Sequence, residues 1–243
     1  MSKRACGKIS LAAGSLNTMK EKWPAKKLKD KKTFEEVVHV WLRNEWHYPC
    51  YNKFRKSVPL NILSNPNFFD ELENKMRFDL LYKNRGHMLK QIPNNTKWYS
   101  IEYSKNDIDR TSLIPMRKGW TSKISGGSCW LRDSLNKKSW EVVNKKCKDI
   151  IHNIYRSLKN KRRQTELILL AENNRSFFSV LEGNHRLVAI ARKMIKSKKT
   201  IKIKAIIGIS PKMKKSPLYR STAKPGLAAG ARYFAGRSSF CGR

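Results

Sequence analysis

The chain has 243 residues and carries 53 Lys and Arg against 18 Asp and Glu, a formal net charge of +35. This length suits one or two domains with a hydrophobic core, and the charge favours a polyanionic partner, chiefly nucleic acid. A coding bias towards Lys and Asn is the alternative explanation. No segment approaches the ~20 apolar residues of a membrane helix, and the five cysteines are scattered and odd in number. We therefore expect a cytoplasmic protein with free thiols and no membrane partner.

The chain begins with a lysine-rich segment without apolar periodicity, so we expect a basic, mostly disordered arm over residues 1–32. A helical region is expected over residues 33–97. Thr33 and Glu36 have the spacing of a capping box, and an apolar helical face follows them.

A second helix is expected from Phe68 to Tyr82, because apolar residues recur there at helical spacing and Gly86 supplies a stop. Its expected buried stripe is Phe69, Leu72, Met76 and Leu80.

The middle of the chain alternates between short elements and loops. Trp98 to Tyr103 alternates as a strand does, Asp107 to Pro115 indicates a turn or short helix, and Ser139 to Leu158 carries an apolar helical stripe. The segment Ser125 to Ser128 is rich in Gly and Ser, which is typical of a flexible connector or of a loop that covers a ligand.

A compact α/β unit is predicted next. Leu167 to Leu170 is a continuous apolar run, as in a buried strand, and Phe177 to Leu181 forms a hairpin with it. Leu187 to Ile195 has a helical apolar face, and Ile201 to Ile207 is a further strand. The expected fold class is α/β (α+β), with a small mixed sheet over residues 98–212 preceded by the helical region.

The last part of the chain changes composition from Lys and Asn to Ala and Gly. It has no clear periodicity, so we expect a disordered basic tail over residues 213–243.

The turn Glu182-Gly183-Asn184-His185-Arg186 joins the hairpin to the helix and carries the chemistry. The N–H groups of a first helical turn and the helix dipole attract anions, and glycine permits close approach of the backbone. Asn184 is expected to cap the helix or contact the ligand, and His185 and Arg186 to donate to a phosphate. Glu182 is expected to bind a metal ion or to act as a general base.

Each of these residues also has a plainer interpretation. Glu182 caps the turn or pairs with Arg186, His185 is a packed histidine, Arg186 solvates the helix face, and Gly183 is structural whatever the ligand. His39 and His47 are spaced too far apart to form a metal site on one helical face.

The segment from Phe178 to Ala189 resembles the signature of the ParB/sulfiredoxin superfamily, with a hydrophobic strand, an acidic residue, Gly-x-His-Arg and an Ala-containing helix. The resemblance implies a compact α/β fold in which this turn binds phosphate, usually of a nucleotide. Sulfiredoxin needs a reactive Cys where Asn184 stands, so its chemistry is not expected here. Partition proteins of the family continue into a helix-turn-helix domain, for which the chain after Gly208 is too short.

Three hypotheses follow. The first is a ParB-like, DNA-associated protein that binds a nucleotide or nucleic-acid phosphate and hydrolyses phosphodiesters or nucleoside triphosphates with Glu182, His185 and Arg186. The others are a small-molecule kinase or phosphotransferase and a nucleic-acid-binding module without catalysis. CTP or ATP and Mg²⁺ are the expected cofactors. A basic patch is expected to track nucleic acid, or is an ordinary solvated face. It comprises Lys161, Arg162, Arg163, Lys193, Lys196, Lys198 and Lys199.

Overall fold

The structure is a computed structural model that describes residues 24–114, 124, 128–158, 166–197 and 201–219. Its strands are β1 (Lys31–Lys32), β2 (Lys97–Ser104), β3 (Thr111–Ser112), β4 (Leu167–Ala171), β5 (Phe178–Glu182) and β6 (Lys202–Ile209). Its α-helices are α1 (Phe34–Glu45), α2 (Asn61–Ser64), α3 (Glu71–Leu89), α5 (Lys137–Glu141), α6 (Lys145–Ser157) and α7 (Asn184–Lys196). Its 3-10 helices are η2 (Pro49–Tyr51), η3 (Lys105–Arg110), η4 (Asp133–Leu135) and η5 (Pro211–Lys215).

The six strands form one mixed sheet in the order β1-β2-β6-β4-β5-β3. β4 and β5 pair antiparallel, as the hairpin prediction required, whereas β4 and β6 pair parallel, with β5 and α7 between them along the chain. β2 runs antiparallel along the whole of β6. The predicted α/β (α+β) fold with a mixed sheet is confirmed.

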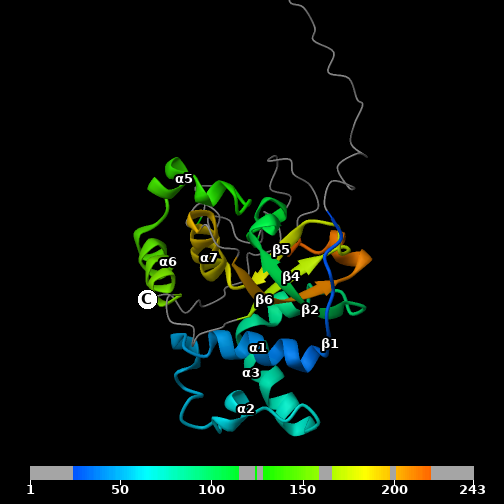
Figure 1. The fold of residues 1–243 in the computed structure, drawn as a ribbon. Coiled ribbons are helices and arrows are strands. Elements are labelled where there is room, and N and C mark those ends of the chain that lie inside the picture. The colour runs from blue at the N-terminus through cyan, green and yellow to red at the C-terminus, as the bar shows by residue number, and fades with distance from the viewer. Residues whose placement is uncertain (1–23, 115–123, 125–127, 159–165, 198–200, 220–243) are drawn as a thin grey trace, which may run out of the picture.

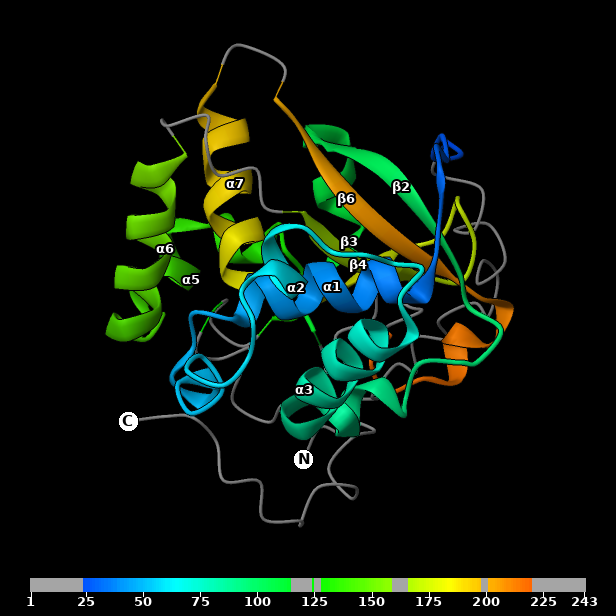
Figure 2. The same cartoon turned by 90° about the horizontal axis from the view of Figure 1, so that it is seen from below.

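Two hydrophobic cores lie on opposite faces of this sheet. On β4, Ile168 and Leu170 join α1 and α3 in one core, while Leu167 and Leu169 join α7 in the other. A strand buried on both faces reads as a continuous apolar run rather than an alternating one. Helices α1, α2 and α3 gather on one side of the molecule and α5, α6 and α7 on another (Figure 1), and Figure 2 shows α1 running across the sheet.

The start of α1 is built as predicted. The Glu36 amide donates to Thr33 Oγ1 at 3.2 Å, and the Thr33 amide donates to Glu36 Oε2 at 2.8 Å, which completes the capping box.

Helix α3 departs from its prediction in extent and in its buried face. It begins after Asp70, whose side chain caps it, and it continues through Gly86 to Leu89. Gly86 does not end the helix, because it is buried inside it with the Tyr82 ring 3.1 Å from the place of a Cβ. Of the expected buried stripe, only Leu80 is buried. The other three residues are exposed: Phe69, Leu72 and Met76.

The helix expected from Ser139 to Leu158 is two helices, α5 and α6. The break falls at Asn144, whose side chain accepts a hydrogen bond from the Lys146 amide and so caps α6.

Both expected disordered ends reach into the fold. At the beginning, Lys29 and Asp30 exchange backbone hydrogen bonds with Ser100 of β2. At the end, Leu218 is fully buried and the Tyr219 hydroxyl donates to the Phe177 carbonyl at 3.1 Å. The prediction of disorder was therefore wrong for residues 24–32 of the arm (1–32) and for residues 213–219 of the tail (213–243). These residues are ordered parts of the structure. The remainder of both lies outside the described residues.

Candidate functional site

The predicted turn forms the junction between β5 and α7. Gly183 is the N-cap of α7 and has a left-handed backbone, with φ at 96°. A Cβ there would lie 2.7 Å from Leu167 Cδ2, so only glycine fits. Among the described residues, no side chain caps the first turn of α7. The partial positive charge at the start of this helix is therefore not neutralised by a cap of the protein's own.

Glu182 at the end of β5 forms an ion pair with Arg186 on the first turn of α7. Arg186 Nη2 donates to Glu182 Oε2, and Asn44 Nδ2 donates to the same oxygen at 2.9 Å. The other hydrogen of Asn44 Nδ2 goes to the Glu166 carbonyl, also at 2.9 Å. Both charged side chains are mostly buried, since Glu182 is 8% and Arg186 14% exposed. The geometry therefore agrees with the plainer interpretation, in which Glu182 pairs with Arg186.

A second buried ion pair lies beside the first and comes from the helical N-terminal region. Arg85 of α3 donates from Nε to Glu45 Oε1 at 2.7 Å, and Trp41 Nε1 donates to the same oxygen at 3.0 Å. The Tyr51 hydroxyl lies 3.5 Å from Glu45 Oε2. Two carboxylates and two arginines are thus assembled from β5, α7, α1 and α3.

Burial raises the pKa of Glu182 to about 7. Arg186 and the hydrogen bond from Asn44 act in the opposite direction, while the negative charge of Glu45 adds to the increase. A carboxyl that titrates near neutral pH is a competent proton acceptor, provided that a substrate reaches it.

His185 is mostly buried, and Asn184 makes a hydrogen bond within the fold. Burial lowers the pKa of His185 to about 4, so its imidazole is neutral at pH 7 and contributes no positive charge. Asn184 Oδ1 accepts a hydrogen bond from the Ile114 amide at 3.0 Å, which ties the chain after β3 to the start of α7. The side chain of Asn184 does not cap its own helix.

The predicted basic patch lies away from this corner or outside the described residues. Lys193 and Lys196 are in the last turn of α7, a helix of 13 residues that spans about 20 Å at 1.5 Å per residue. Lys193 Nζ donates to the Leu158 carbonyl at 2.8 Å. Five members of the patch fall outside the described residues: Lys161, Arg162, Arg163, Lys198 and Lys199. The loop residues Ser125, Gly126 and Gly127 also fall outside.

A histidine from the end of α1 lies beside the motif. His47 is exposed just after α1, and its pKa is lowered by burial of part of the ring and then by the charges of Arg186 and Arg55. The imidazole is therefore within electrostatic reach of both guanidinium groups. His47 does not share a site with His39, as the sequence indicated.

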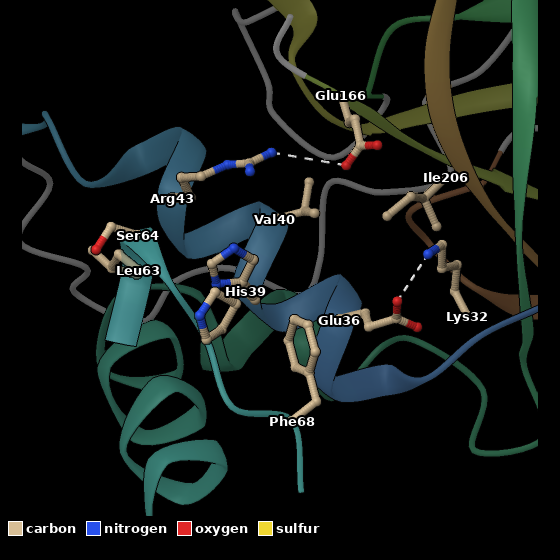
Figure 3. Close-up of a pocket in the computed structure, with 11 residues that line it drawn as sticks. Lys32, Glu36, His39, Val40, Arg43, Leu63, Ser64, Phe68, Glu166 and Ile206 are labelled. Atoms are coloured by element: carbon tan, nitrogen blue, oxygen red, sulfur yellow. Dashed lines mark hydrogen bonds and ion pairs between the residues drawn. The ribbon is translucent and has the colours of Figure 1, made fainter. Parts of the chain in front are cut away.

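His39 lines a cavity of about 260 Å³ between α1, the segment after α2 and β6 (Figure 3). Two ion pairs border it: Lys32 with Glu36 at 2.8 Å, and Arg43 with Glu166 at 3.8 Å. Burial, with the charges of Arg43 and Arg77, lowers the pKa of His39 to about 4. The cavity adjoins the first ion pair through Glu166, whose carbonyl binds Asn44.

Three residues of this charge network were not predicted from the sequence: Asn44, Glu45 and Arg85. The first two could have been found, because they are polar residues that extend the apolar face of α1, with Glu45 one turn after Trp41. Arg85 carries no such signal, since its partner is 40 positions away.

The residues around Glu182 do not match a divalent-cation site. Among the residues that the structure describes, no three His, Cys, Asp or Glu side chains gather as metal ligands. Glu182 and Glu45 each already have an arginine as counter-ion, whereas Mg²⁺ requires carboxylate oxygens that are open to it. We derive no role for a metal ion here.

Fold and site together define an α/β protein in which a helical N-terminal region and a mixed sheet share a buried charge network. Comparisons with models of protein families, with curated proteins and with solved structures found no match. Within the described part of the chain, no helix has the length and apolar character needed to cross a bilayer.

Proposed function

We propose that the chain binds a phosphate group of a nucleic acid or nucleotide at the start of α7. The observation that carries the proposal is a left-handed glycine that leads into a helix without a side-chain cap, with Arg186 on its first turn. The dipole of the helix favours an oxyanion at such a position. Arg186 engages Glu182 through Nη2, and its other N–H groups, which have no partner among the described residues, would bind the phosphate.

The resemblance to the ParB/sulfiredoxin superfamily supports this proposal. The order of β5, Gly183, α7 and β6 matches the strand, turn, helix and strand that the resemblance implies. The charge of +35 favours nucleic acid as the carrier of the phosphate.

Hydrolysis is the second candidate function, and the pKa of Glu182 near 7 favours it. A phosphate that attracts Arg186 would free Glu182 to accept a proton from an attacking water molecule. CTP and ATP are the nucleotides to test first, and a small-molecule phosphotransferase would transfer the phosphate to a hydroxyl instead of water.

The test uses a double substitution that keeps the net charge of the buried pair. Glu182→Gln with Arg186→Gln removes the phosphate contact without leaving one buried charge unpaired. Affinities of the full chain are measured by fluorescence anisotropy with short oligonucleotides and by calorimetry with CTP and ATP. We expect a loss of roughly tenfold or more in the affinity for whichever ligand binds, as a charged hydrogen bond of about 1.5–3 kcal/mol implies.

Unchanged affinity of the double variant would refute phosphate binding at this turn. Nucleotide binding by the wild-type chain without oligonucleotide binding would favour the phosphotransferase.

A further inference from the structure

The segment between α1 and α2 is basic and lies next to the proposed phosphate site. From residue 46 to residue 69 the sequence contains no Asp or Glu. Its basic residues Lys53, Arg55 and Lys56 are exposed. His47, at the beginning of the segment, is within electrostatic reach of Arg186 of α7. The segment begins beside the α7 site, because Asn44 near the end of α1 donates a hydrogen bond to Glu182 at 2.9 Å.

Arg55 is held in place by the backbone. Its Nε and Nη2 donate to the Trp46 carbonyl at 3.0 and 2.7 Å, and Nη2 also donates to the Tyr48 carbonyl at 3.1 Å. Carbonyl groups fix the orientation of the guanidinium without neutralising it. Less conformational entropy is then lost when it binds an anion than with a free side chain.

The neighbouring lysines also lack acidic partners among the described residues. Lys53 Nζ lies 5.0 Å from the centre of the Phe54 ring, and Lys83 of α3 reaches the same ring at 4.9 Å. Some lysines elsewhere on the surface pair with carboxylates, as Lys32 does with Glu36 and Lys75 with Asp79.

We propose that Lys53, Arg55, Lys56 and Lys83 form a basic ridge that extends the α7 site past His47, and that the ridge binds the backbone of a nucleic acid. The inference rests on the proposed function for its first phosphate, at Arg186. A free nucleotide carries its phosphates at one end, so it would contact only the cations at the α7 site and not those along the ridge. A polynucleotide carries one charge per nucleotide and engages a row of cations.

The test compares two pairs of exposed lysines of equal charge. Lys53→Gln with Lys56→Gln changes the ridge, and Lys214→Gln with Lys215→Gln changes η5, which lies on the opposite side of the molecule in Figures 1 and 2. Both variants lower the net charge by two and leave the buried groups intact. Binding of the full chain to labelled single- and double-stranded oligonucleotides is measured across a salt series, together with CTP and anionic phosphatidylserine vesicles.

We expect the ridge variant to lose roughly tenfold in oligonucleotide affinity per contact at about 0.1 M salt, and its salt slope to fall by about one per lysine. The η5 variant keeps an affinity close to that of the wild-type chain, and both variants bind CTP as the wild-type chain does.

Equal losses in the two variants would overturn the ridge, because the effect would then be one of net charge. Binding of CTP or of vesicles without binding of oligonucleotides would overturn it as well. If the ridge variant loses affinity while Glu182→Gln with Arg186→Gln does not, the ridge stands and the phosphate site at α7 fails.

Discussion

Gly183 has a left-handed backbone, and a Cβ added to it would collide with the side chain of Leu167. A left-handed conformation costs about 1–2 kcal/mol for a residue with a Cβ, and the contact at 2.7 Å adds to this cost. We therefore expect Gly183→Ala to lower the free energy of unfolding by about 2–4 kcal/mol, measured by urea denaturation.

The control for this substitution is Gly86→Ala. Gly86 is helical, and the nearest obstacle is the ring of Tyr82, a side chain that can move. Alanine is preferred in a helix by about 0.5–1 kcal/mol, which offsets the displacement of the ring. A variant at Gly183 as stable as this control would show that the turn is not built as described.

Glu182 makes stability depend on pH in a direction opposite to that of most carboxyl groups. Its pKa is about 7 in the folded chain against 4.5 as its ordinary value, so the folded state binds the proton more tightly. Its contribution is fully present below pH 4.5 and is lost as the pH rises through about 7. The difference in unfolding free energy between the wild-type chain and Glu182→Gln should fall by about 3 kcal/mol across this window. A difference that rises with pH would mean that Arg186 dominates and lowers this pKa.

At the scale of the elements, the ion pair of Glu45 and Arg85 fastens α3 to the end of α1. Arg85→Ala leaves a carboxylate that is 6% exposed without its counter-ion. Removal of one partner from a buried pair costs about 3–5 kcal/mol. We expect this loss in chemical denaturation.

The double variant Glu45→Gln with Arg85→Gln separates charge from packing. It leaves no unpaired charge, so it should be more stable than Arg85→Ala. If both variants were equally unstable, the packing of the Arg85 stem would matter and its charge would not.

The exposed face of α3 shows why periodicity alone can mislead. Phe69, Leu72 and Met76 recur at helical spacing, yet Phe69 is 98% and Leu72 78% exposed. Another face, with Leu81 and Leu89, meets α1. When one helix has two apolar faces, the element that packs against it decides which face is buried. The local sequence of the helix does not identify that element.

At the scale of the whole molecule, a net charge of +35 opposes compaction through self-repulsion. Salt screens this repulsion over a Debye length of about 10 Å at 0.1 M and about 3 Å at 1 M. We expect the melting temperature to rise as sodium chloride increases from low concentration to 0.5 M. Calorimetry checks this, with sucrose of matched osmolality as control. A flat or falling melting temperature would mean that ion pairs such as Glu45 with Arg85 outweigh the repulsion.

The sequence by itself determined the hairpin, the glycine turn, the helix that follows it and the capping box of α1. Each depends on contacts within a few positions, where side-chain type and spacing are sufficient. Only the tertiary structure decided that Asn44 meets Glu182 and Arg85 meets Glu45, that residues 213–219 enter the core, and which face of α3 is buried. These contacts join positions tens of residues apart, and the free energy that selects them comes from burial in the folded chain, which no local pattern encodes.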